Sequence, residues 1–411
     1  MNLRRQLLVS FGVQGMGAAS VLLATLWLGI SLGPEVQGGF SRTKAEIEFV
    51  AAFAMFGLPQ ALFFYVKSGG LSQRLALRWA GGSAVLALLI GMAYAGFRAG
   101  GAGALPLVTA LSTGAAVAAC VAHGQLRALL LVSNRTAGFS AVTAMPQLAV
   151  LVGVACAIAL GAHSPQSWTI VFALAFGAAA LLAWRWLPEL PAAPSARQAD
   201  WRALGHYGLA AWLTAALPTA AILLVQHWVE VSQGRAALGQ FTMAMTLVQL
   251  PLVPIAYAAP LLFRHWMERP GAHASRRWAT AFFIGLFGVA VATWALAPAW
   301  PDLGLGAAYD GATRAFALLL AGGAAEAASR VLTVQAGASG LPWVAVRAEA
   351  VRWVVLAVGA QMVLPAGLLS AQPSPPGLLP MCAVWAAAAW ASGLVVVLHA
   401  NKGAGQAGAT R

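Results

Sequence analysis

The chain has 411 residues, of which 60% are hydrophobic and 9% are charged, and its formal net charge is +13. An ordinary soluble protein is about 45–50% apolar and about 25% charged. This composition excludes a water-soluble globular enzyme, a disordered chain and a small disulfide-stapled domain, and it indicates a polytopic α-helical membrane protein.

The hydrophobic pattern predicts about twelve membrane spans, since each needs ~20 largely apolar residues. The first follows Arg4 and Arg5, and its apolar stretch is longer than the ~7–15 residues of a signal-peptide core. In chain order the predicted spans are Leu7–Leu32, Glu48–Val66, Trp79–Phe97, Leu105–Ala122, Ala137–Leu160, Trp168–Leu187, Leu204–Gln226, Phe241–Phe263, Trp278–Leu296, Ala315–Val334, Trp343–Leu364 and Gly377–His399.

The basic residues are distributed unevenly across this map. If both termini are cytoplasmic, 19 of the 24 Lys and Arg residues fall on the cytoplasmic side and 5 on the other. The five are Arg42, Lys44, Arg98, Arg235 and Arg314. An excess of Lys and Arg in cytoplasmic loops is the usual rule, so the count supports both the number of spans and the orientation.

A polar stretch from Pro188 to Arg202 divides the spans into two sets of six. We expect an N-terminal lobe (1–187), a cytoplasmic linker (188–203), a C-terminal lobe (204–399) and a cytoplasmic tail (400–411). The halves show weak similarity: Pro59 lies twenty residues after Gly39, and Pro260 lies twenty-one residues after Gly239. An even number of spans per half predicts a parallel repeat, related by a pseudo-twofold axis along the membrane normal.

Several short segments resemble one transporter family. They are Leu32-Gly33-Pro34-Glu35-Val36-Gln37-Gly38-Gly39-Phe40, Phe56-Gly57-Leu58-Pro59-Gln60-Ala61-Leu62, Trp201-Arg202 to Tyr207-Gly208, Ala237-Leu238-Gly239-Gln240-Phe241, Ala259-Pro260 and Gly306-Ala307-Ala308-Tyr309. Together they resemble the polysaccharide transporter (O-antigen flippase) family of the multidrug/oligosaccharidyl-lipid/polysaccharide (MOP) superfamily. The chain departs from some relatives in having twelve spans rather than fourteen, and its first helix lacks charges that some relatives place there.

The resemblance implies an all-α MOP flippase-like fold, with two six-helix lobes around a central cavity that works by alternating access. The implied substrate is an undecaprenyl-diphosphate-linked oligosaccharide, a repeat unit of O-antigen, capsule or exopolysaccharide. It would move from the cytoplasmic to the periplasmic leaflet of the bacterial inner membrane. The implied partners are the lipid-linked oligosaccharide, membrane lipids, and a polysaccharide polymerase and glycosyltransferases of the same pathway, but no nucleic acid.

Such a transporter must carry a sugar-diphosphate head across ~30 Å of hydrocarbon. A bare anion is very costly there, so the path needs cationic groups and hydrogen-bond donors. The sequence contains no Gly-rich phosphate loop, no His/Cys cluster and no serine-hydrolase elbow. We therefore predict a transporter that catalyses no covalent change and uses no cofactor and no metal.

The strongest candidates for that path are Arg330, Arg347 and Arg352, with Glu326 and Glu349 nearby. All fall in the predicted inner half of the tenth and eleventh spans, and intramembrane charge is a functional hypothesis by default. Three other interpretations stay open. The arginines could extend to the inner interface, or their ion pairs could hold the two helices together. The two spans could also extend a turn less far than predicted, which would leave these residues in a loop.

A second group of candidates has amide, aromatic or basic side chains on the first, second, seventh and eighth spans. They are Gln14, Gln60, Tyr65, Lys67, Gln226, His227 and Gln249. Planar amides and aromatic faces bind sugars, but membrane glutamines also form hydrogen bonds between helices. Pro59 is expected to bend the second helix and free a carbonyl beside Gln60, and Lys67 could meet a phosphate or anchor the helix end.

Two other functions compete with this interpretation. A cation-coupled multidrug exporter of the same superfamily would favour a membrane-embedded carboxylate, which the first two spans lack at mid-depth. A membrane polymerase or ligase acting on the same lipid would need a large periplasmic loop, and the predicted outer loops are short.

Overall fold

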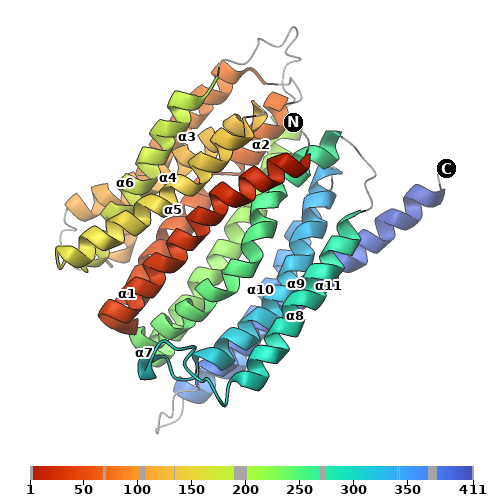
Figure 1. Ribbon diagram of the computed structural model, residues 1–411. Helices are drawn as coiled ribbons and strands as arrows, with labels where there is room; N and C mark the ends of the chain where they lie inside the picture. The colour runs from red at the N-terminus through yellow and green to blue at the C-terminus, as the bar shows by residue number, and fades with distance from the viewer. Residues whose placement is uncertain are drawn as a thin grey trace. The chain divides into compact units, whose positions relative to one another are not determined.

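The structure is a computed structural model that describes residues 3–67, 71–100, 107–133, 135–188, 201–268, 274–339, 341, 343–368 and 377–409. These residues form helices and no strands (Figure 1). The helices are α1 (Leu3–Ala54), α2 (Leu58–Lys67), α3 (Gln73–Arg98), α4 (Leu107–Val132), α5 (Thr136–Ala159), α6 (Pro165–Trp186), α7 (Trp201–Glu268), α8 (Ala274–Leu296), the 3-10 turn η1 (Ala307–Tyr309), α9 (Ala312–Ala338), α10 (Trp343–Leu368) and α11 (Leu378–Ala409).

Two of these helices are interrupted by a glycine. Gly33 in α1 has φ 81° and ψ 172°, and Gly234 in α7 has φ 86° and ψ 175°. Residues with a Cβ avoid this region, so glycine allows the chain to reverse there. Counting each of these helices as two segments, with α2 continuing the second segment of α1, gives the twelve predicted passes. By length and composition, nine helices of the described chain could cross a membrane, α1 and α7 among them.

The turns at these glycines are shorter than the sequence predicts. The expected connection between the first two spans is helical from Pro34 onward, and the one between the seventh and eighth spans is helical except at Gly234. Charged residues remain in helix because they pair one turn apart: Arg42 contacts Glu46 at 2.8 Å and Lys44 contacts Glu48 at 2.8 Å. The helix of the second pass therefore begins about four helical turns before the predicted start of the span at Glu48.

The second pass is broken before Pro59, not at it. Phe56 and Gly57 have φ values of 47° and 67°, and α2 begins at Leu58, so Pro59 lies in a first turn where proline is tolerated. At the break the carbonyl of Phe53 accepts a hydrogen bond from the Phe56 N–H at 3.4 Å and another from Trp212 Nε1 at 2.9 Å. The expected bend exists, but its cause is the positive-φ pair.

The chain forms two compact units. The first contains Met1–Ala24 and Phe40–Leu223, and the second contains Thr25–Gly39 and Leu224–Arg411. In the first, α4 packs against α3 and α6, and α5 packs against α6. In the second, α9 packs against α8 and α11, and α10 packs against α11. Each unit thus contains the same packing order, as a duplicated lobe requires.

The sequence positions follow the same duplication. Gly234 follows Gly33 by 201 positions, and the same spacing separates Pro260 from Pro59. The repeat that is faint in the sequence therefore coincides with matching backbone turns. Most of the predicted linker, 188–203, lies outside the described residues, so the lobe boundaries stay a prediction. The predicted tail is helical as far as Ala409.

Candidate functional site

Four charged residues of α9 and α10 form a cluster inside the second unit, named here the charged cluster: Glu326, Arg330, Glu349 and Arg352. Arg330 Nη2 lies 2.5 Å from Glu326 Oε1, and Arg330 Nε lies 3.1 Å from the same oxygen. Arg352 Nη1 lies 3.5 Å from Glu349 Oε1. The i,i+4 and i,i+3 spacings bring each pair together on one helix face. The pairs also interact with each other electrostatically.

Burial differs sharply across the charged cluster. The Arg352 side chain is 4% exposed, whereas the Arg330 side chain is 36% exposed. The Arg352 guanidinium also lies 5.9 Å from the centre of the Trp385 ring on α11, a cation–π distance. Arg352 Nε and Glu349 Oε2 are buried without a hydrogen-bond partner. Arg352 is therefore placed to join helices, while Arg330 can reach a ligand.

The third predicted arginine lies elsewhere. Arg347 is exposed, and its Nη1 lies 3.3 Å from His399 Nε2 on α11. The structure thus brings together two of the three predicted arginines and both glutamates.

The candidates of the first unit differ in exposure. Gln14 is 1% exposed, and its Nε2 donates to Ser10 Oγ and, at 3.4 Å, to Ser140 Oγ on α5. Gln14 therefore fits the alternative interpretation, a hydrogen bond between helices. Gln60 is exposed on α2, and Tyr65 and Lys67 are half-buried towards the end of the same helix.

The candidates of the second unit all lie on α7. Gln226 is 6% exposed, and its Oε1 is buried without a hydrogen-bond partner. His227 is exposed, and Gln249 is half-buried.

A buried polar pair that the sequence did not predict lies in the second unit. The Tyr309 hydroxyl of η1 donates to Gln37 Oε1 at 2.5 Å, and both residues are at most 1% exposed. Gln37 Nε2 is buried without a partner. Burial raises the pKa of Tyr309 to about 12. Both residues belong to segments that carry the family resemblance, but their 272-position separation gives no sign that they meet.

Within the described helices, the carboxylates are almost all paired with a basic residue. Glu46, Glu48, Glu230, Glu326 and Glu349 each form an ion pair. Among the helical carboxylates whose side chains the structure describes, the exception is Glu35, which is exposed just after the Gly33 turn. Nor do three His, Cys, Asp or Glu side chains of the described chain meet as a metal site. The helices therefore offer a cation few free carboxylates.

The fold is shared with solved membrane transporters. A mutant of the Vibrio cholerae MATE transporter VcmN is 16% identical, with a TM-score of 0.70 over 98% of this chain and 97% of that one. The lipid II flippase MurJ in an inward closed conformation is 11% identical, with a TM-score of 0.69 over 95% and 86%. A MOP superfamily transporter from Pyrococcus furiosus is 15% identical, with a TM-score of 0.64 over 97% and 94%.

These neighbours give the chain the fold of MOP superfamily transporters. No protein-family model matches the sequence, and no curated protein sequence does either.

Proposed function

We propose that the chain flips an undecaprenyl-diphosphate-linked oligosaccharide from the cytoplasmic to the periplasmic leaflet of the bacterial inner membrane. Both termini are cytoplasmic in this proposal, and the glycan is a repeat unit of O-antigen, capsule or exopolysaccharide. Glycosyltransferases of the same pathway supply the substrate, and a polysaccharide polymerase consumes it. The fold similarity to the lipid II flippase MurJ supports a lipid-linked substrate.

The observation that carries the proposal is the pairing of the helical carboxylates with Arg or Lys. A transporter that exchanges a cationic drug for a cation needs an ionised carboxylate that is free to bind either one. A carboxylate beside a guanidinium has already satisfied its charge, and removing the partner is costly. The chain's excess of basic residues suits an anionic diphosphate better. Arg330 is its accessible contact, because its side chain is 36% exposed against 11% for Glu326 and it binds Glu326 through Nε and Nη2, which leaves Nη1 for a phosphate.

The second candidate function is a cation-coupled multidrug exporter. It is favoured by the length match, because this chain covers 97% of the MATE transporter VcmN but 86% of MurJ. Glu35, exposed and without an ion pair among the described residues, would be the first carboxylate to test in that case.

In the deciding experiment, the gene is deleted in its native bacterium, and the lipid-linked oligosaccharides of the deletion strain are extracted and compared with those of the wild type. The flippase proposal predicts accumulation of undecaprenyl-linked repeat units and loss of surface polymer, both restored by the wild-type gene. Unchanged glycolipids together with greater sensitivity to cationic drugs would contradict it and favour the exporter.

A further inference from the structure

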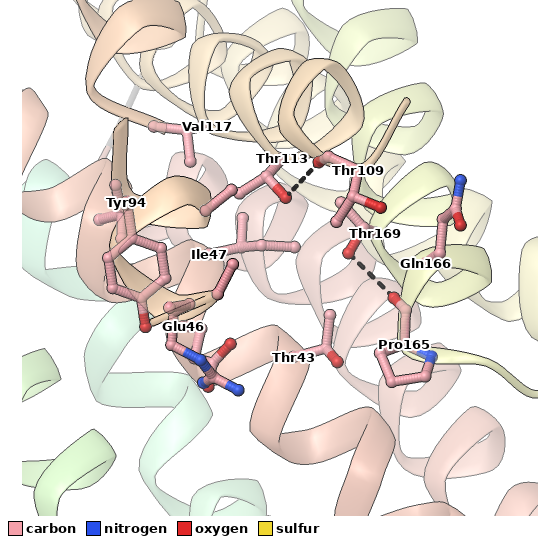
Figure 2. Close-up of a pocket in the computed structure, with 14 residues that line it drawn as sticks. Thr43, Glu46, Ile47, Tyr94, Thr109, Thr113, Val117, Pro165, Gln166 and Thr169 are labelled. Carbon is pink, nitrogen blue, oxygen red and sulfur yellow. Dashed lines mark hydrogen bonds and ion pairs between the residues drawn. The ribbon is translucent and has the colours of Figure 1, made fainter. Parts of the chain in front are cut away.

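A cavity of about 270 Å³ lies within the first unit, and its lining includes five hydroxyl side chains (Figure 2). It is lined by the segment of α1 after Gly33 and by α3, α4 and α6, and it is open on one side. We name it the threonine pocket. It lies near the end of α3 and the beginnings of α4 and α6, which is the outer side in the predicted orientation.

The hydroxyl groups of the threonine pocket come from Thr43, Tyr94, Thr109, Thr113 and Thr169. The Thr113 hydroxyl donates to the Thr109 carbonyl at 2.9 Å, and the Thr169 hydroxyl donates to the Pro165 carbonyl at 2.9 Å. Figure 2 shows both bonds at the edge of the same space. Because their protons are engaged, these two oxygens can still accept hydrogen bonds from a ligand.

The charges of the threonine pocket nearly balance. Glu46 accepts from Arg42 Nε at 2.8 Å and also forms an ion pair with Arg98. The Glu46 side chain is 16% exposed, and the Arg98 side chain is 48% exposed at the rim. Arg42 does not line the pocket, and the two charged residues that do, Glu46 and Arg98, pair with each other, so the lining presents no net charge to a cation or a phosphate. The lining therefore suits an uncharged ligand that both donates and accepts hydrogen bonds.

We propose that the threonine pocket binds one uncharged sugar ring of the glycan, which rests on the flippase function proposed above. At ~30 Å³ for each water, the volume of the pocket corresponds to about nine waters. A pyranose with its hydroxyls has about a dozen non-hydrogen atoms, and because bonded atoms lie closer together than separate waters, one ring matches this volume. Sugar hydroxyls would donate to Thr113 and Thr169 and accept from Arg98. The predicted outer position makes this a subsite for the head group after it has crossed.

The experiment uses the full chain in nanodiscs of phosphatidylcholine and phosphatidylglycerol, because glycosidic detergents would compete. The probes are D-glucose, D-galactose and N-acetyl-D-glucosamine, and binding is read by saturation-transfer NMR. At least one probe should bind the wild type. Thr113→Val and Thr169→Val should each weaken it about two- to tenfold, the range for one lost hydrogen bond.

The matched control is Thr293→Val on α8. Thr293 also donates to the carbonyl one turn earlier, at 2.8 Å, but does not line the pocket, so this variant should bind the sugar as the wild type does. The proposal is overturned if no probe binds, or if the two pocket variants bind as tightly as the control.

This result is separate from the deletion experiment. Accumulated lipid-linked glycans with no sugar binding would reject the subsite and keep the flippase. Pocket-dependent sugar binding without such accumulation would keep a sugar site and reject the flippase.

Discussion

Removing the charge of Arg352 should destabilise the protein far more than removing that of an exposed arginine. Its guanidinium is almost fully buried and lies 3.5 Å from the Glu349 carboxylate. At that distance the attraction is about 5 kcal/mol for an effective dielectric constant of ~20. In Arg352→Gln the buried Glu349 carboxylate loses its partner while Glu326 stays nearby, so we expect a loss of about 3–5 kcal/mol.

The assay heats the purified full chain and measures the fraction that stays folded at each temperature. With an unfolding entropy of about 2 cal/mol/K per residue, this loss lowers Tm by about 4–12 °C. The lower end of this range applies if the whole chain unfolds as one cooperative unit, and the upper end applies if the second unit unfolds alone. The control, Arg185→Gln at the end of α6, changes an exposed arginine and should shift Tm by less than about 1 °C.

The double variant Glu349→Gln/Arg352→Gln tests whether the two charges act together. Because neither charge is then left alone, its loss should be smaller than that of Arg352→Gln. A role for the buried pair is refuted if Arg352→Gln melts like the control, or if the double variant loses as much stability as Glu349→Gln and Arg352→Gln added together.

Three further results are expected. Arg330→Ala, made together with Glu326→Gln so that no buried carboxylate is left unpaired, should lower export of the lipid-linked glycan about tenfold or more while its membrane level stays normal, since this guanidinium is accessible; normal export would remove it from the path. Gly239→Ala should melt earlier than the wild type, because its Cβ would clash with the backbone oxygen of Pro34, whereas Gly285→Ala, with open space around it, should be neutral or stabilising. Tyr309→Phe should cost about 1 kcal/mol by losing its hydrogen bond. The contribution of the Tyr309 hydroxyl to the free energy of unfolding should be complete below pH ~10 and lost as the pH rises through its pKa of about 12. Tm measured as a function of pH would test this.

The sequence predicts the helices well because each apolar stretch is a local signal. It fails at the residues after Gly33, where Arg42, Lys44 and Glu46 look like a loop by hydropathy. In the structure the same residues form a helix, because each charge has a partner. Hydropathy counts charges singly and so misses this compensation.

The charged cluster was predictable only in part. Glu326 and Arg330 meet because they are one helical turn apart, which the sequence reveals. The contact of Arg352 with Trp385 depends on how α10 packs against α11, and no local pattern reports it. Arg347 contacts His399 on α11 and not the charged cluster, and this too depends on how the helices pack.

The composition of the two units sets an order for folding during synthesis. Residues 25–39 belong to the second unit, but the rest of that unit begins at Leu224, which follows Gly39 by 185 positions. At ~5–20 residues per second, the ribosome needs about 10–40 s to make that length. During this time residues 25–39 are in the membrane, but the helices they pack against in the second unit have not yet been made. We expect insertion chaperones to bind this segment until α7 is complete.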